Sequence, residues 1–224
     1  SANALIPLPE NIDDQTAAAM MLKGMTVHML LFKCYAVQPG DTILIHAAAG
    51  GVGNILCQWA NHLGVTVIGT VGNDEKAEKA RASGCHYPIN YSTDDFTEKV
   101  KEITSGRGVP VVYDSVGKDT FEGSLDCLKT FGAMVTFGNA SGPVPAIEPL
   151  VLMQKGSITL CRPTLMHYAA DNNRRNKAAT DLFEVVGNGD VNIEVGQTFP
   201  LSETAEAHRA LESRKTTGST VLLP

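Results

Sequence analysis

The chain has 224 residues, of which 43% are hydrophobic and 19% are charged, a balance that is typical of a globular protein and excludes an intrinsically disordered one. A formal net charge of -6 without any basic run argues against nucleic-acid binding, because phosphate contacts depend on clustered Lys and Arg. The sequence has no uninterrupted apolar run of about 18 residues and no basic leader followed by an apolar core. We therefore expect a cytoplasmic protein without a membrane span.

Short runs rich in β-branched residues alternate with helical patterns along most of the chain. A long helical stretch comes first, from Asp13 to about Pro39. Strands are expected at 42–45, 65–68, 88–91, 109–113, 133–137 and 157–160, and helices between them at 52–63, 73–84 and 94–104. Nearly all-apolar strands that alternate with helices favour βαβ units around a buried parallel sheet.

The C-terminal part continues this alternation with one helix, one strand, a second helix and a second strand. The expected ranges are 171–186, 197–201, 202–213 and 219–223, with Ser202 as the N-cap of the second helix.

A small-residue loop, His46–Gly53, lies between the first buried strand and a helix with a continuous apolar stripe. Small residues let the backbone approach a pyrophosphate closely, and the free N–H groups at the start of the helix bind its negative charge. The spacing is Ala-x-x-Gly-x-x-Gly, with Ala47 in the place of the first glycine of the usual fingerprint. The context predicts a dinucleotide site at Gly50, Gly51, Val52 and Gly53.

The end of the second strand indicates which dinucleotide binds. An NAD site places Asp or Glu there, about 20 residues after the loop, to hold the ribose hydroxyls. Here the strand ends in Gly72 and Asn73, and Lys76 follows in the first turn of the next helix. A cation after a strand end without a carboxylate favours the 2′-phosphate of NADPH. Two other interpretations stay open: Lys76 is an ordinary solvated helix residue, or Asp74 or Glu75, which also fall within the expected interval, holds the ribose, although Asp74 also suits a helix cap.

Two further strand ends, Asp114–Gly117 and Gly138–Gly142, are expected at the same edge of the sheet. Their glycines either make simple turns or line the ribose and nicotinamide part of a cofactor. No acid–base constellation is recognisable in the chain. His46 has a structural role in this interpretation, and the other histidines have no evident carboxylate partner, so we name no catalytic residue.

The five cysteines are dispersed and contain no CxxC pair, a pattern that indicates reduced thiols and predicts neither a disulfide framework nor a metal site.

Several stretches together resemble the zinc-independent NADPH:quinone oxidoreductases of the medium-chain dehydrogenase/reductase superfamily, which include the zeta-crystallin-like enzymes. The stretches that carry the resemblance are Lys23–Val27, His46–Gly53, Ile89–Tyr91, Tyr113–Gly117 and Leu211–Arg214. The resemblance implies an α/β Rossmann fold, a doubly wound parallel sheet of order 3-2-1-4-5-6, and a homodimer. It also implies a dinucleotide-binding domain at 25–165, with residues 1–24 and 166–224 completing a GroES-like catalytic domain. We expect most of that domain to be absent from this chain.

The resemblance assigns cofactor contacts residue by residue. Gly51 and Val52 are expected at the pyrophosphate, Gly72 and Lys76 around the 2′-phosphate, and Tyr91 near the adenosine. Ser115, Val116, Phe137, Gly138 and Asn139 belong to the strand ends along the ribose and nicotinamide, and Arg214 is expected on a phosphate.

The expected function is the cofactor-binding portion of an enzyme that transfers hydride from NADPH to a quinone. Two alternatives stay open at this point. One is an enone or enoyl reductase of the same superfamily, and the other is an NADPH-binding module without activity, such as a redox sensor or an RNA-associated crystallin-like protein.

Overall fold

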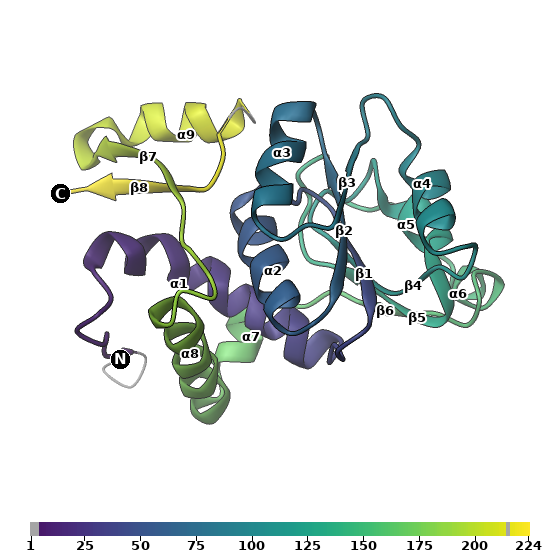
Figure 1. The fold of residues 1–224 in the computed structure, drawn as a ribbon, viewed down its shortest axis with the longest axis horizontal. Helices are drawn as coiled ribbons and strands as arrows, with labels where there is room; N and C mark the ends of the chain where they lie inside the picture. The colour runs from purple at the N-terminus through teal and green to yellow at the C-terminus, as the bar shows by residue number, and fades with distance from the viewer. Residues whose placement is uncertain (1–4, 214–215) are drawn as a thin grey trace.

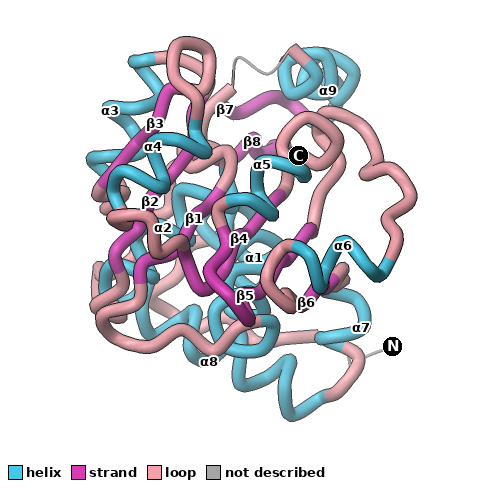
Figure 2. Tube along the Cα trace, turned by 90° about the vertical axis from the view of Figure 1, so that its right-hand side faces the viewer, coloured by secondary structure: helices cyan, strands magenta, loops and turns pink. Residues whose placement is uncertain are grey.

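A computed structural model describes residues 5–213 and 216–224. The predicted Rossmann architecture is confirmed: six parallel strands form one sheet in the order β3-β2-β1-β4-β5-β6 (Figure 2). The strands are β1 (Thr42–Ile45), β2 (Thr66–Val71), β3 (Tyr87–Asn90), β4 (Val109–Asp114), β5 (Leu128–Thr136) and β6 (Thr159–Cys161).

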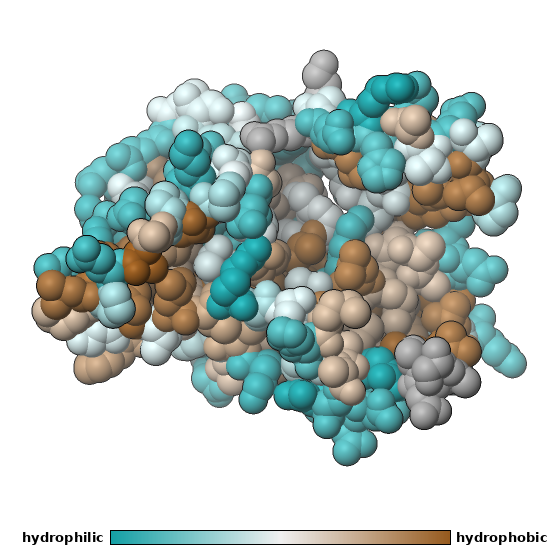
Figure 3. Space-filling model, turned by 180° about the vertical axis from the view of Figure 1, so that it is seen from behind, coloured by the Kyte–Doolittle hydropathy of each residue, from teal (hydrophilic) through white to brown (hydrophobic). Residues whose placement is uncertain are grey.

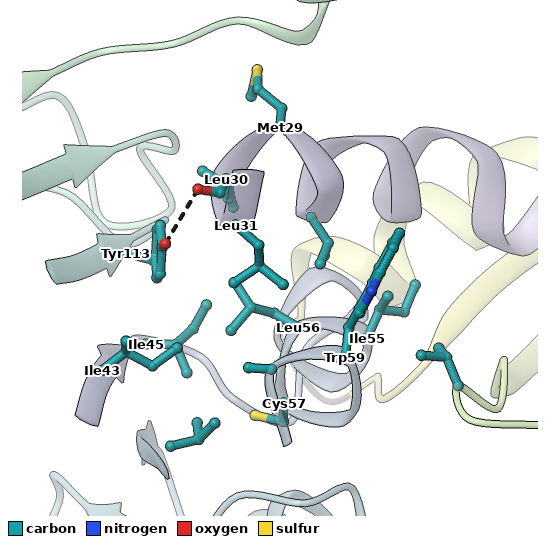
Figure 4. Close-up of a cluster of buried hydrophobic side chains, with 14 of the residues drawn as sticks. Met29, Leu30, Leu31, Ile43, Ile45, Ile55, Leu56, Cys57, Trp59 and Tyr113 are labelled. Atoms are coloured by element: carbon teal, nitrogen blue, oxygen red, sulfur yellow. Dashed lines mark hydrogen bonds between the residues drawn. The ribbon is translucent and has the colours of Figure 1, made fainter. Parts of the chain in front are cut away.

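Helices cover both faces of this sheet (Figure 1). One face packs against α1 (Asp14–Met29), α2 (Gly51–His62) and α3 (Asp74–Ala82), and α8 (Asn172–Gly187) packs on α1. The other face packs against α4 (Phe96–Ile103), α5 (Phe121–Asp126) and α6 (Pro149–Gln154). The apolar stripe predicted for α2 is buried, with Ile55, Leu56 and Trp59 in the core (Figure 4).

A second, smaller sheet lies apart from the first, at the upper left of Figure 1. It pairs β7 (Val195–Pro200) in parallel with β8 (Ser219–Leu223), and α9 (Thr204–Glu212) connects the two strands. The Lys23 ammonium donates to the Ser219 hydroxyl at 2.7 Å, and this hydroxyl donates to the Ala19 carbonyl at 2.9 Å. These bonds fix the start of β8 to α1.

The first helix ends earlier than predicted. It continues from α1 into a π-helical turn, η2 (Leu30–Cys34), and stops at Tyr35, well before Pro39. The buried Tyr113 hydroxyl donates to the Leu30 carbonyl at 3.2 Å, as Figure 4 shows, and Tyr35 N–H bonds the same carbonyl at 3.3 Å. A competing side-chain donor at a helical carbonyl accounts for this local change of helix type.

Together α1 and η2 form a helix, Asp14–Cys34, that is long and apolar enough to cross a membrane, which a search for uninterrupted apolar runs misses. More than half of its most apolar window, 56%, is buried inside the molecule. Its packing against α2, α8 and β8 identifies it as the core helix of the fold.

Two smaller predictions were wrong or incomplete. Ser202 is not an N-cap, because a 3₁₀ turn, η3 (Leu201–Glu203), precedes α9, and the Thr204 hydroxyl bonds the Leu201 carbonyl at 2.6 Å. The short helices α5, α6 and α7 (Leu165–Ala169) were not identified, since one or two turns are too short to display an apolar stripe.

Candidate functional site

The loop between β1 and α2 has the close-packed backbone that the glycine pattern predicts. Ala47 adopts a φ of 57°, a left-handed conformation that favours glycine, and its carbonyl accepts from Gly50 N–H at 2.9 Å. A Cβ added to Gly53 would lie 2.2 Å from this carbonyl oxygen and 2.8 Å from Ala48 Cα. Gly53 is therefore required for the first turn of α2 to lie against the loop.

Lys23, a residue for which we predicted no role, lies at the same corner. A Cβ added to Gly51 would be 2.8 Å from Lys23 Cε and 2.9 Å from its Nζ. Burial lowers the pKa of this lysine, and its ammonium is held by Ser219. This contact joins α1, α2 and β8, which are far apart in the sequence, so a local sequence pattern does not predict it.

The end of β2 brings a second group of predicted residues together. A Cβ on Gly72 would lie 3.0 Å from the Tyr91 hydroxyl, and Asn73 caps α3 by accepting from Lys76 N–H at 2.8 Å. The nearest acid, Asp74, accepts from Asn90 Nδ2 at 2.8 Å. The end of β2 therefore brings together four predicted residues, Gly72, Asn73, Lys76 and Tyr91. The first carboxylate after this strand, that of Asp74, is bonded to the side-chain amide of Asn90 at the end of β3.

The ends of β4 and β5 form the third group. Buried Asp114 accepts from Val116 N–H at 2.7 Å and Gly117 N–H at 3.0 Å, so its role is to shape this turn. A Cβ on Gly138 would lie 2.3 Å from the Ser115 carbonyl oxygen. Further backbone bonds join Phe137 to Asp114, Ala140 to Ser115 and Ser141 to Val116, and Asn139 is exposed beside them.

All three groups lie at the carboxyl edge of the parallel sheet, and backbone bonds connect them. Ala48 N–H donates to Thr70 O and His46 N–H donates to Tyr113 O, both at 3.0 Å. His46 itself is buried, with Thr70 and Ser124 hydroxyls 2.8 Å from its two ring nitrogens. Burial lowers its pKa, and with both nitrogens bonded it has the structural role that we expected.

Beside Phe137 lies a cavity of about 410 Å³ that our interpretation of the sequence did not identify. Its walls come from α1, the end of β5 and the segment after β6. They consist of Thr26, Met29, Phe137 and the run Arg162–Leu165. The Arg162 guanidinium donates to the Thr136 carbonyl at 2.9 Å, which fixes this segment to the end of β5.

The expectation that the histidines lack carboxylate partners was wrong. His28 Nε2 lies 2.9 Å from Asp181 of α8 and its Nδ1 lies 3.0 Å from the Tyr168 hydroxyl, while His62 lies 3.3 Å from Asp190. These partners are far away in sequence, which is why local inspection missed them. The His28 cluster lies in the core between α1 and α8 and has a packing role.

Arg214, predicted on a phosphate, lies outside the described residues. Within the described ranges, no group of three or more His, Cys, Asp or Glu side chains is arranged to hold a metal ion.

A dinucleotide fits this edge of the sheet. Positions 50, 51 and 53 at the start of α2 carry no side chain, and the end of β2 presents Gly72 and Asn73 where an NAD site has an acid. The residues present therefore suit a pyrophosphate at α2 and a 2′-phosphate near Lys76.

Comparison with known proteins agrees with this geometry. Residues 51–184 match the family model described as zinc-binding dehydrogenase. A quinone oxidoreductase of Pseudomonas aeruginosa is 52% identical over 98% of this chain and 68% of its own length, and a 2-haloacrylate reductase of a Burkholderia species is 50% identical over 100% and 68%. The crystal structure of Escherichia coli quinone oxidoreductase complexed with NADPH superimposes with a TM-score of 0.97 at 47% identity, and covers 100% of this chain and 69% of that one.

Proposed function

The chain belongs to the zinc-binding dehydrogenase family, and on that premise we propose that it is the cofactor-binding portion of an NADPH-dependent quinone oxidoreductase. The observation that carries the proposal is the end of β2, where Gly72 and Asn73 stand in the place of an acid beside the pyrophosphate loop and Lys76 follows in the first turn of α3. Bound NADPH would supply the hydride that reduces the quinone.

The residues of this chain would bind and orient the cofactor. The N–H groups at the start of α2 would hold the pyrophosphate, with Lys23 as a neighbouring cation, and Lys76 would pair with the 2′-phosphate. Tyr91 beside Gly72 would lie along the adenosine. The ribose and nicotinamide would lie along the ends of β4 and β5, and the acceptor would bind in the cavity beside Phe137. The residues at these strand ends are Ser115, Val116, Phe137, Gly138 and Asn139.

Cofactor titration by calorimetry tests the role of Lys76. Lys76→Ala is expected to weaken NADPH binding by about 1.5–3 kcal/mol, the scale of a charge-assisted hydrogen bond, and to leave NADH binding almost unchanged. Arg81→Ala is the control, because Arg81 lies in the last turn of the same helix and pairs with Glu78, away from the end of β2. Equal affinity of the unmodified chain for NADPH and NADH would refute the proposed specificity.

A second acceptor class is favoured by the composition of the cavity. Arg162 is the charged residue among its lining residues, and a fixed guanidinium suits the carboxylate of a substituted acrylate. Reduction of 2-haloacrylates, the activity named for one relative, is therefore the alternative, and turnover with parallel quinone and acrylate panels separates the two.

The remaining parts of the proposal concern organisation. We propose that residues 25–165 bind the cofactor, and that 1–24 and 166–224 complete a GroES-like catalytic domain in a cytoplasmic homodimer. The two-stranded β7–β8 sheet supports this division, because two strands alone are marginally stable and need further packing.

A further inference from the structure

Two cysteines from distant parts of the sequence meet at one pocket. Cys34 is the last residue of η2 and Cys161 is the last residue of β6, and both line a pocket of about 290 Å³. Both side chains are partly exposed. Burial, followed by the charge and hydrogen bond of Cys161, raises the pKa of Cys34 to about 12, so Cys161 is a neighbour of this thiol within the shared pocket.

The pocket around this pair is cationic. Its lining includes Lys33, Arg162, His167 and Arg174, and no Asp or Glu is among the lining residues. Cationic neighbours stabilise a sulfur anion as it forms or leaves, and they attract negatively charged thiol compounds. The environment therefore suits exchange with an anionic disulfide such as oxidised glutathione.

A second thiol pair shows what distinguishes the first. Cys57 and Cys85 also interact, and this contact contributes to raising the pKa of Cys57 well above its usual range. Both of these residues are fully buried in the core, at 0% and 1% exposure. Proximity is common to both pairs, and only Cys34 and Cys161 combine it with access from solvent.

We propose that Cys34 and Cys161 form a thiol–disulfide exchange site that low-molecular-weight disulfides oxidise. In the first step the Cys161 thiolate attacks one sulfur of the small disulfide, whose S–S bond breaks, so that a mixed disulfide forms and one thiolate leaves. In the second step the Cys34 thiol gives its proton to solvent and its sulfur attacks Cys161, which displaces the second thiolate. The two cysteines lose two electrons, and the small disulfide is reduced to two thiols.

The order of attack follows from the two environments. With a pKa of about 12, Cys34 stays protonated near neutral pH and is a poor first nucleophile. Part of that rise comes from Cys161, and this part disappears once Cys161 carries the mixed disulfide.

The disulfide would tie η2 to the end of β6, directly before the run Arg162–Thr164. These three residues line both the cysteine pocket and the cavity beside Phe137. Oxidation would therefore restrain the segment Arg162–Thr164, which separates the cysteine pocket from the cavity beside Phe137. Its consequence for the acceptor rests on the proposed function, whereas the exchange chemistry does not.

The experiment uses the full chain treated with oxidised glutathione and analysed by intact mass and peptide mapping. We expect a Cys34–Cys161 cross-linked peptide, free thiols at Cys57 and Cys85 as the internal control, and a thermal midpoint that rises by about 5 °C or more and returns on reduction. Cys34→Ser should stop at a glutathione adduct on Cys161, and Cys161→Ser should form adducts at least about tenfold more slowly.

Absence of the cross-linked peptide, or an adduct on Cys34 in Cys161→Ser at the unmodified rate, would overturn the proposal. Circular dichroism of both variants establishes that they fold. NADPH titration measures the proposed function separately, so either proposal can fail while the other stands.

Discussion

Gly53 is the residue on which the shape of the pyrophosphate loop depends most directly. Gly53 lies in the first turn of α2, where the Ala47 carbonyl and the Ala48 backbone leave no room for a Cβ. Ala47 adopts its left-handed φ in the same turn, at a cost of roughly 1–2 kcal/mol for a residue other than glycine. A conformation that unfavourable persists only because the surrounding backbone bonds hold it.

Gly53→Ala is expected to destabilise the chain by about 1–3 kcal/mol, because rigid backbone atoms must shift, and to weaken NADPH binding as the loop opens. Gly51→Ala is the comparison variant for stability, since the atoms that its Cβ would meet belong to the Lys23 side chain, which can shift at the cost of its bond to Ser219, and not to the backbone. Urea unfolding measures both. Equal stability of the two variants would show that the loop tolerates a side chain at position 53.

The loop residues illustrate what can be inferred from sequence at this scale. The small residues between β1 and α2 and the missing acid after β2 predict the site because local backbone geometry dictates these residue types. Lys23 and Arg162 were missed as site residues, because each reaches the site through contacts between distant elements that leave no trace in local spacing.

At the scale of elements, the strands and the longer helices were predictable because each carries its own signal. Buried parallel strands give all-apolar runs, and α2 has an apolar stripe over three turns. The π-helical turn at the end of α1 was not predictable, since it depends on the Tyr113 hydroxyl from β4. The link between α1 and α8 was missed for the same reason, although it is one of the more extensive polar contacts in the core.

The His28–Asp181 contact is expected to stabilise the packing of α1 on α8. Asp181→Ala should lower the free energy of unfolding by about 1–3 kcal/mol, because the buried ring nitrogen of His28 loses its acceptor. Glu184→Ala, on the same helix, is the control and should change stability little. Chemical denaturation at neutral pH measures both, and equal values for the two variants would contradict a stabilising role for the contact.

At the scale of the whole molecule, exposed apolar side chains lie beside one edge strand of the large sheet, β6. Apolar side chains gather at the left of Figure 3, the end that carries α6 in Figure 1. Phe131, Leu150 and Met153 are 78%, 54% and 56% exposed. Phe131 also has a φ of 61°, an outlier for a bulky residue, and its N–H is bonded to the Gly156 carbonyl at 2.8 Å. Exposed apolar groups beside an edge strand are typical of an interface.

The proposed homodimer can be tested at this end of the sheet. Met153→Glu places a charge in the apolar patch. In a monomer this charge stays in water, whereas a dimer interface would bury it at a cost in free energy, so we expect a shift toward monomer in sedimentation velocity. Tyr87→Glu is the control, because Tyr87 lies on β3 at the opposite edge and is also exposed. It should leave the association unchanged. If the unmodified chain sediments as a monomer at micromolar concentration, or if both variants dissociate equally, the β6 edge is not the interface and the exposed Phe131 needs another explanation.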